Sequence, residues 1–280
     1  MGTTDHLVRR ARPSLGTIVE IGVSPEHEST LNAGFGEIIR IHQLMSFHET
    51  TSDLAKLRAA TAGELIELGP DTISVLRISG DLHRSTNGLF NIAIGRQLIR
   101  TGFLPRMDTV HLGRFDGNAD DIEIVDDRHV RLRRCTLIDL GGIAKGYAVD
   151  CAVAALKAAG ATRGIVNAGG DLRVFGDTSM PVQTRLAHGE YSEPFVLRDC
   201  AVASSENMHS RRIAKGRVMT PHIGHDGQSI VTNQTVSVIA NTCAIADAMT
   251  KVAMLDPDLA DQLLAQDGGR VVQYLPCEAD

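Results

Sequence analysis

The twelve residues from 139 to 150, DLGGIAKGYAVD, constrain the fold of this chain more than any other segment. A carboxylate, two adjacent glycines and a lysine stand directly before a stretch in which apolar and small residues recur at helical spacing. The preceding residues 131–138, RLRRCTLI, have the composition of a strand. The sequence therefore predicts a strand, a tight turn at Gly141 and Gly142, and a helix over residues 143–159.

A turn of this kind leaves free backbone N–H groups at the start of the helix, which is a geometry that suits phosphate. Glycines allow a ligand to approach the backbone, Lys145 supplies positive charge, and Asp139 can accept hydrogen bonds. The spacing fits neither GxGxxG nor GxxxxGK[ST], the two commonest nucleotide fingerprints. Taken alone, the segment therefore favours a purely structural turn whose glycines adopt positive φ.

The rest of the chain predicts an α+β fold. Residues 14–23 predict a strand, and helices are predicted at 29–48, 52–57 and 71–85. A short strand is predicted at 122–125, and strands without intervening helices, which indicate antiparallel pairing, follow at 164–166, 172–175, 182–186, 194–197, 201–204, 218–222 and 235–239. Helices at 241–255 and 258–266 and a strand at 270–274 complete the pattern. No linker or repeat divides it, so we expect one domain over residues 1–280, built of one or two lobes.

Composition and charge narrow the choice of partners. The formal net charge is −6, and the nearest approach to a basic run is Arg9, Arg10 and Arg12, which argues against nucleic acid. Aromatic residues make up 4% with no Trp, so base-stacking surfaces are not expected. The N-terminal residues lack an apolar signal region, no stretch is long enough to span a membrane, and the five cysteines are scattered. We therefore expect a cytoplasmic protein with reduced, buried cysteines.

The helix predicted at 241–255 is nearly all apolar apart from one polar strip. Asp247 and Lys251 are four residues apart and share a helix face, with Thr250 beside them. Such a pair is either a surface ion pair or part of the lining of a cavity. The apolar residues around the pair leave little room for a solvent-facing surface, so the lining of a cavity remains a possible interpretation.

A further polar segment is MTPHIGHDG at residues 219–227. His222 is a candidate general base at neutral pH, although an ordinary loop histidine is the default interpretation. Zinc is disfavoured because His222, His225 and Asp226 have no convincing additional ligand. No GxSxG motif or cysteine in a reactive setting offers a nucleophile.

Several strings, in this order, resemble those of the ApbE-type flavin transferases (FAD:protein FMN transferases), over nearly the whole chain. They are SLGT at 14–17, MSFHETTSDLAKLR at 45–58, GLFN at 88–91, DLGGIAKGYAVD at 139–150, VNAGGDLRVFG at 166–176, VASSE at 202–206, PHIGHDG at 221–227 and ADAMTKVAML at 246–255. The resemblance implies an α+β fold with T-fold-like antiparallel sheets packed with helices and an FAD cleft between lobes. It also implies an enzyme that uses FAD and Mg²⁺ to place FMN on a Thr or Ser hydroxyl of an acceptor protein.

The resemblance also implies roles for individual residues. FAD would be contacted by Leu15, Asp139, Lys145 and Ile223, and the metal would be bound by Gly142, through its carbonyl, Asp247 and Thr250. His222 matches the histidine proposed as the base for the acceptor hydroxyl. A hard cation would take such oxygen ligands, and phosphoryl transfer depends mainly on positioning and on charge neutralisation.

Departures from the family pattern keep two alternatives open. Lys251 stands where the family commonly has Thr, and we hypothesise that it either displaces the metal and neutralises the phosphates itself or pairs with Asp247 and weakens metal affinity. The PHIGHDG segment lacks the family's Asp-Pro, Asn91 replaces an Asp, and Glu206 replaces a Gly. The alternative functions are an FAD-binding protein of the same fold without transfer activity, and an FAD pyrophosphatase that releases FMN and AMP.

Overall fold

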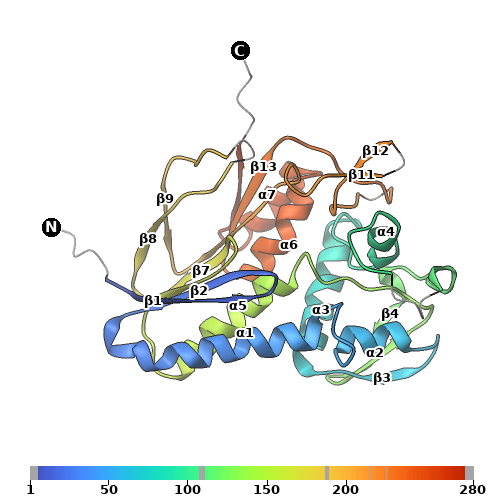
Figure 1. The fold of residues 1–280 in the computed structure, drawn as a ribbon, viewed down its shortest axis with the longest axis horizontal. Helices are drawn as coiled ribbons and strands as arrows, with labels where there is room; N and C mark the ends of the chain where they lie inside the picture. Colours follow the sequence, from blue (N-terminus) through green and yellow to red (C-terminus); the bar gives the residue numbers. More distant parts are fainter. Residues whose placement is uncertain (1–5, 107–110, 187–188, 215, 225, 275–280) are drawn as a thin grey trace, which may run out of the picture. The chain divides into compact units, whose positions relative to one another are not determined.

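The computed structural model describes residues 6–106, 111–186, 189–214, 216–224 and 226–274. Its helices and strands (Figure 1) are, in chain order, β1 (Val8–Ser14), β2 (Thr17–Val23), α1 (Leu31–Met45), α2 (Asp53–Ala59), β3 (Leu65–Glu67), α3 (Pro70–Ser85), α4 (Gly95–Arg100), β4 (Ile122–Ile124), β5 (His129–Leu132), α5 (Ala144–Ala158), β6 (Gly164–Ala168), β7 (Asp171–Phe175), β8 (Ser179–Val182), β9 (Phe195–Arg198), β10 (Ala201–Ser205), β11 (Arg212–Ala214), β12 (Arg217–Met219), β13 (Thr235–Ala240), α6 (Cys243–Ala253), α7 (Pro257–Ala265) and β14 (Arg270–Tyr274). The strands pair antiparallel. The predicted α+β class with antiparallel sheets is therefore confirmed.

The chain divides into two compact units, each assembled from separate segments. Unit 1 consists of Met1–His42, Ile143–Glu206 and Asn233–Asp280, and unit 2 of Gln43–Gly142 and Asn207–Thr232. That residues 1–280 behave as a single domain stays a prediction. Among the described helices, none is both long and apolar enough to cross a membrane.

Unit 1 is built on a seven-stranded sheet with the order β1-β2-β6-β7-β10-β13-β14. Helices α5 and α6 contact each other and pack on the central strands. Strand β7 shows how the two faces of the sheet are divided. Its alternate residues Leu172 and Val174 join an apolar cluster that also contains Val202 and Ile239. The opposite face of β7 carries the residues that meet α5.

The contact between α5 and α6 depends on two residues of the 139–150 segment. A Cβ atom on Gly146 would lie 2.2 Å from the Cys243 carbonyl oxygen, so only glycine permits this approach. Asp150 accepts hydrogen bonds from the N–H groups of Cys243 (3.0 Å) and Ala244 (2.9 Å) and forms an ion pair with Arg173. The end of this segment thus fixes the start of α6.

Unit 2 contains the three-stranded sheet β3-β5-β4, the two-stranded sheet β11-β12, and helices α2, α3 and α4. The strand predicted at 131–138 is wrong over most of its length, because β5 ends at Leu132. The following segment is irregular but bonded to residues 92–95, through Asp139 N–H to Ile92 O and Gly95 N–H to Leu137 O. Its apolar side chains reflect burial rather than strand pairing.

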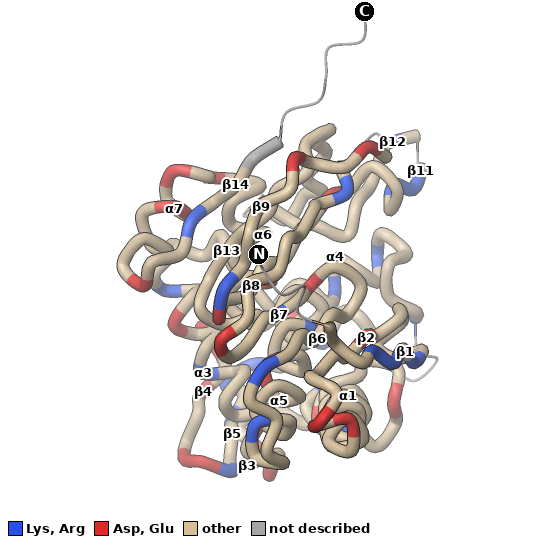
Figure 2. Tube along the Cα trace, turned by 90° about the vertical axis from the view of Figure 1, so that its left-hand side faces the viewer, with Lys and Arg blue, Asp and Glu red and all other residues tan. Residues whose placement is uncertain are grey.

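Other differences from the predicted elements concern polar or short segments. The strand predicted at 14–23 begins only at Thr17, as β2, and the arginine-rich β1 (Figure 2) was not predicted because it lacks apolar alternation. Its charges suit an edge strand: Arg9 pairs with Glu20 and Arg10 with Glu28. The strand predicted at 182–186 lies instead at β8, the strand predicted at 218–222 ends at Met219, and β3, β11 and α4 were not predicted.

Candidate functional site

The unit 1 part of the candidate site lies at one end of the seven-stranded sheet. Two tight turns lie there, because β2 starts beside the end of β6 in the register Val19↔Ala168. Leu15 (φ 54°) and Gly16 (φ 71°) join β1 to β2, and Gly169 (φ 67°) and Gly170 (φ 105°) join β6 to β7. The strands predicted at 164–166 and 172–175 are thus joined by a tight Gly-Gly hairpin. It places Asp171, the first residue of β7, at this end of the sheet.

Lys145 lies on the first turn of α5 and forms an ion pair with Asp171. Next along these two elements come the pairs Asp150–Arg173 and Lys157–Phe175, the latter a cation–π contact of 5.6 Å. The face of β7 that meets α5 is therefore polar and charged at its start and aromatic at its end. This pairing fixes the Lys145 ammonium at the sheet end that carries the two turns.

Asp247 lies in the middle of α6 and is fully buried. Its Oδ1 forms an ion pair with Lys251, whose Nζ also donates to the Asp247 carbonyl oxygen at 2.9 Å. Its Oδ2 accepts a hydrogen bond from the Gly146 N–H at 3.3 Å, so an orphan N–H near the α5 N-terminus is satisfied by a carboxylate. Of the two interpretations left open for this helix strip, the surface ion pair is excluded by the burial of Asp247.

Thr250 is also fully buried, on the turn after Asp247. Its hydroxyl donates to the Asp247 carbonyl oxygen at 2.7 Å and forms a second hydrogen bond of 2.7 Å with the Ser205 hydroxyl. Ser205 ends β10 at the same end of the sheet, since β10 runs antiparallel to β7 in the register Val202↔Leu172 and so ends near Asp171. The predicted residues Lys145, Asp247 and Thr250 are thus brought together within unit 1.

Electrostatics separate the two carboxylates of this cluster. Burial and the neighbouring Asp247 raise the pKa of Asp171 to about 6, against the opposing effect of Lys145 and Lys251. Burial would also raise the pKa of Asp247, but Lys251, Lys145 and the Gly146 N–H together hold that pKa below its ordinary value. Burial would lower the pKa of Lys145, but Asp247 and Asp171 outweigh it and raise that pKa. Asp247 is therefore ionised and Lys145 protonated at neutral pH.

Asp139 and Gly142 belong to unit 2. The Gly141 N–H donates to Asp139 Oδ2 at 3.1 Å, so part of the turn is closed by its own carboxylate, and Gly141 does not have positive φ. The interpretation of this segment as a purely structural turn assumed glycines with positive φ, and Gly141 does not meet that assumption. Burial raises the pKa of Asp139, while the Gly141 N–H and His48 lower it to a smaller extent.

His222 and Ile223 lie on a small hairpin of unit 2 that follows β12. The bridge Ile223↔Ser229 closes it, and the Ile230 N–H donates to the His222 carbonyl oxygen at 2.8 Å. The buried Thr220 hydroxyl donates to the Ile230 carbonyl oxygen at 2.6 Å, which fixes the base of the hairpin. The backbone at His222 is thus held by hydrogen bonds on both strands of the hairpin, while His225 lies outside the described residues.

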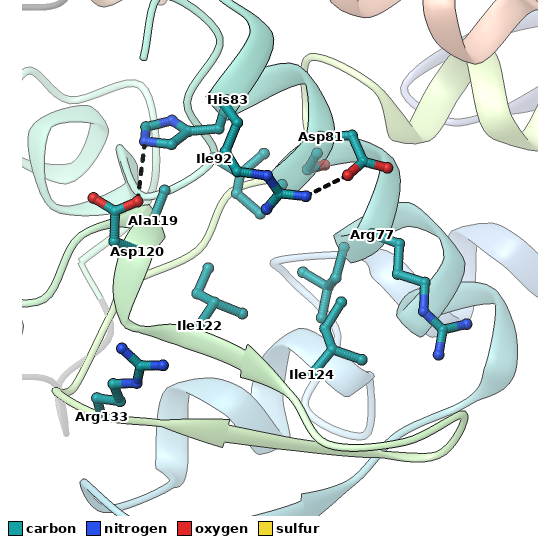
Figure 3. Close-up of a pocket in the computed structure, with 13 residues that line it drawn as sticks. Arg77, Asp81, His83, Ile92, Ala119, Asp120, Ile122, Ile124 and Arg133 are labelled. Carbon is teal, nitrogen blue, oxygen red and sulfur yellow. Dashed lines mark hydrogen bonds and ion pairs between the residues drawn. The ribbon is translucent and has the colours of Figure 1, made fainter. Parts of the chain in front are cut away.

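A cavity of about 460 Å³ lies in unit 2 between α3 and the β4 strand (Figure 3). Ile92, Ile122 and Ile124 provide apolar walls, and its charged groups are paired, His83 with Asp120 and Arg84 with Asp81. None of its lining residues is one that the sequence predicts to contact FAD. We assign this cavity no role in the candidate site.

Three residues of the unit 1 cluster were not predicted from the sequence, namely Gly146, Asp171 and Ser205. Asp171 carries the clearest signal, because it is a carboxylate at the first position of a strand, directly after a Gly-Gly turn. Gly146 carries a weaker one, as a glycine inside a helix of small residues. Among the described residues, no group of three or more His, Cys, Asp and Glu side chains could hold a metal ion.

Comparison with known proteins gives a consistent result. The family model described as "ApbE family" matches residues 15–273. A curated FAD:protein FMN transferase from Rhodobacter capsulatus is 29% identical over 239 residues, which are 79% of this chain and 45% of that protein. The chain therefore spans about half the length of this relative.

Solved structures show the same fold. The ApbE protein of Thermotoga maritima MSB8 has a TM-score of 0.84 at 23% identity, covering 96% of this chain and 94% of that one. The apo form of the flavinyl transferase ApbE of Pseudomonas stutzeri has a TM-score of 0.79 at 18% identity, covering 96% and 95%. These likenesses concern the fold, whereas the family model matches the sequence from Leu15 almost to its end. The chain belongs to the ApbE family.

Proposed function

We propose that this chain is an FAD:protein FMN transferase with a T-fold-like core and an FAD cleft. In this reaction a Thr or Ser oxygen of an acceptor protein attacks the FMN phosphorus of FAD, and the bond to the bridging pyrophosphate oxygen breaks. FMN becomes esterified to the acceptor, AMP leaves, and the hydroxyl proton passes to a base. The observation that carries the proposal is the pair of ammonium groups, Lys145 and Lys251, at the sheet end beside the start of α5.

The predicted residues have distinct roles in this proposal. Lys145 and Lys251 neutralise the pyrophosphate, whose charge must be offset both in the bound state and in the transition state. His222 takes the hydroxyl proton, since a neutral imidazole is a suitable acceptor at physiological pH. Leu15, Asp139 and Ile223 contact the rest of FAD. The cytoplasmic location stays a prediction.

Magnesium at Gly142, Asp247 and Thr250 also stays a prediction, and the unit 1 part of that donor set fits a divalent ion poorly. Mg²⁺ requires nearly octahedral oxygen ligands, and it would supply charge neutralisation and a Lewis acid at the phosphates. Both Asp247 carboxylate oxygens are already engaged, by Lys251 and by the Gly146 N–H. The Thr250 hydroxyl is engaged by the Asp247 carbonyl and by Ser205. We therefore derive no step through the metal.

Incubation of the purified protein with FAD tests the proposed function. With an acceptor protein of a related flavin transferase supplied, we expect FMN covalently attached to the acceptor and one AMP released per transfer, measured by mass spectrometry and chromatography. FMN and AMP released without acceptor would indicate a pyrophosphatase instead. FAD that stays bound and intact would indicate a binding protein without transfer activity, and absence of FAD binding would overturn all three functions.

The role of His222 is tested by His222→Ala. We expect transfer to fall by about two to four orders of magnitude, the usual contribution of a general base, with FAD affinity retained. His129→Ala is the matched control, because His129 lies in the same unit, pairs with Asp126 and has no predicted role in the reaction. Transfer by His222→Ala at the rate of the control would remove His222 from the catalytic role.

A further inference from the structure

The Lys145–Asp171 and Lys251–Asp247 pairs form one charge-balanced cluster of two carboxylates and two ammonium groups in unit 1. Their exposure differs in a way that decides what the cluster offers a ligand. The Asp247 and Asp171 side chains are 1% and 3% exposed, whereas those of Lys251 and Lys145 are 21% and 35% exposed. The side chains that are accessible to a ligand at this end of the sheet are therefore those of the two lysines, whereas the two carboxylates are buried.

Lys251 is held at Asp247 by more than one acceptor. Its Nζ contacts the Asp247 carboxylate and the Asp247 carbonyl oxygen of the same helical turn, so the side chain closes a ring on α6. A cation that bound the Asp247 carboxylate would have to displace this ammonium group. The displaced Lys251 and the nearby Lys145 would then both repel the cation.

Exposure, rather than net charge, favours an anion as the ligand. The four groups sum to zero, so their net charge alone selects neither a cation nor an anion. The pyrophosphate of FAD is negatively charged, and the more exposed side chains of the cluster are those of the two lysines. The N-terminus of α5, a helix of 15 residues, adds a favourable dipole for an anion.

We infer that the Lys251 ammonium occupies, in this chain, the position beside Asp247 that a divalent cation would take, so that the cluster binds the FAD pyrophosphate without a bound metal ion. The inference rests on the proposed function for the identity of its ligand. The part of the inference that concerns metal binding depends only on Lys251 and Asp247. Lysine supplies a single positive charge that is covalently attached to the chain, so no free divalent ion is needed. Its side chain is flexible, however, and does not orient the phosphates as a coordinated ion would.

Titration with Mn²⁺, followed by the electron paramagnetic resonance signal of the free ion, tests the metal component. We compare wild type with Lys251→Thr, which removes the ammonium group and adds an oxygen donor, and with Lys251→Met, which removes the charge at similar length. We expect wild type to bind Mn²⁺ at least tenfold more weakly than Lys251→Thr, with Lys251→Met between them. Equal Mn²⁺ affinity of wild type and Lys251→Thr would overturn the inference.

The ligand component is tested by FAD binding, measured by flavin fluorescence with and without EDTA. We expect the affinity of wild type for FAD to be unchanged by EDTA, and that of Lys251→Met to be at least tenfold weaker. Loss of FAD binding by wild type in EDTA would contradict the inference even if both variants failed to fold. If wild type binds no FAD under any condition, the proposed function fails, while the Mn²⁺ titration still decides the role of Lys251.

Discussion

At the scale of the single residue, Leu15 stands out because it adopts a left-handed backbone conformation with φ of 54°. A non-glycine residue in this region costs about 1 kcal/mol, and such strain is found where the surrounding structure or a ligand requires a particular side chain. Both central residues of the turn have positive φ, and Asn-Gly is the sequence that such a two-residue hairpin prefers. Leu15 therefore carries a cost in stability, and its contact with FAD stays a prediction.

Leu15→Asn separates stability from ligand binding at this turn. We expect it to raise the free energy of unfolding by about 0.5–1 kcal/mol, because Asn tolerates the left-handed region, and to weaken FAD binding. Chemical denaturation and a fluorescence titration measure the two effects. Leu15→Ala is the control, since it removes the side chain but keeps the strain, so it should weaken FAD binding without the gain in stability. Unchanged FAD affinity in both variants would exclude Leu15 from the flavin contact.

At the scale of elements, the junction of α5 with α6 depends on Asp150. This carboxylate binds two N–H groups at the start of α6 and the half-buried Arg173 of β7, so one side chain connects three elements. Burial raises the pKa of Asp150, which its N–H donors and Arg173 oppose. Removal of the side chain would leave these two N–H groups and the Arg173 guanidinium without their carboxylate partner.

We expect Asp150→Ala to lower the free energy of unfolding by about 3 kcal/mol, because it leaves a partly buried arginine and two N–H groups unpaired. Asp150→Asn retains one acceptor and should cost about half as much. Asp127→Ala removes the partner of Arg77 in an exposed ion pair and should have a much smaller effect. Urea denaturation of the three variants measures the series, and equal losses in Asp150→Ala and Asp127→Ala would contradict the role of Asp150.

The same elements show what the sequence can and cannot predict. Helix α5 and strands β7 and β13 were predicted because their periodicity follows from burial on one or both faces. Strand β1 was not, because an arginine-rich edge strand has little apolar alternation. Lys145, Asp247 and Thr250 were proposed from local motifs and from the family resemblance. Their partners Asp171, Gly146 and Ser205 lie 26, 101 and 45 residues away, so only the folded sheet reveals the pairing.

At the scale of the whole molecule, the chain path determines which part of the site can be removed alone. Residues 207–232 of unit 2 leave unit 1 after β10 and return before β13, and these strands are neighbours paired through Ser205↔Val236. All seven strands of the large sheet and the complete Lys145–Asp171–Asp247–Lys251 cluster lie outside this excursion. His222 lies inside it. The predicted base and the predicted pyrophosphate site are thus carried by separable parts of the chain.

Replacing residues 207–232 by a short Asn-Gly turn tests this separation, because such a turn can join two adjacent antiparallel strands. We expect the variant to keep the far-UV circular dichroism of the unit 1 sheet and to bind inorganic pyrophosphate, since the ammonium groups remain, but to lose FMN transfer with His222. Lys251→Met in the shortened chain is the matched control and should weaken pyrophosphate binding. A folded variant that no longer binds pyrophosphate would show that the cluster requires groups from the removed segment, and the assignment of the anion site to unit 1 alone would then be wrong.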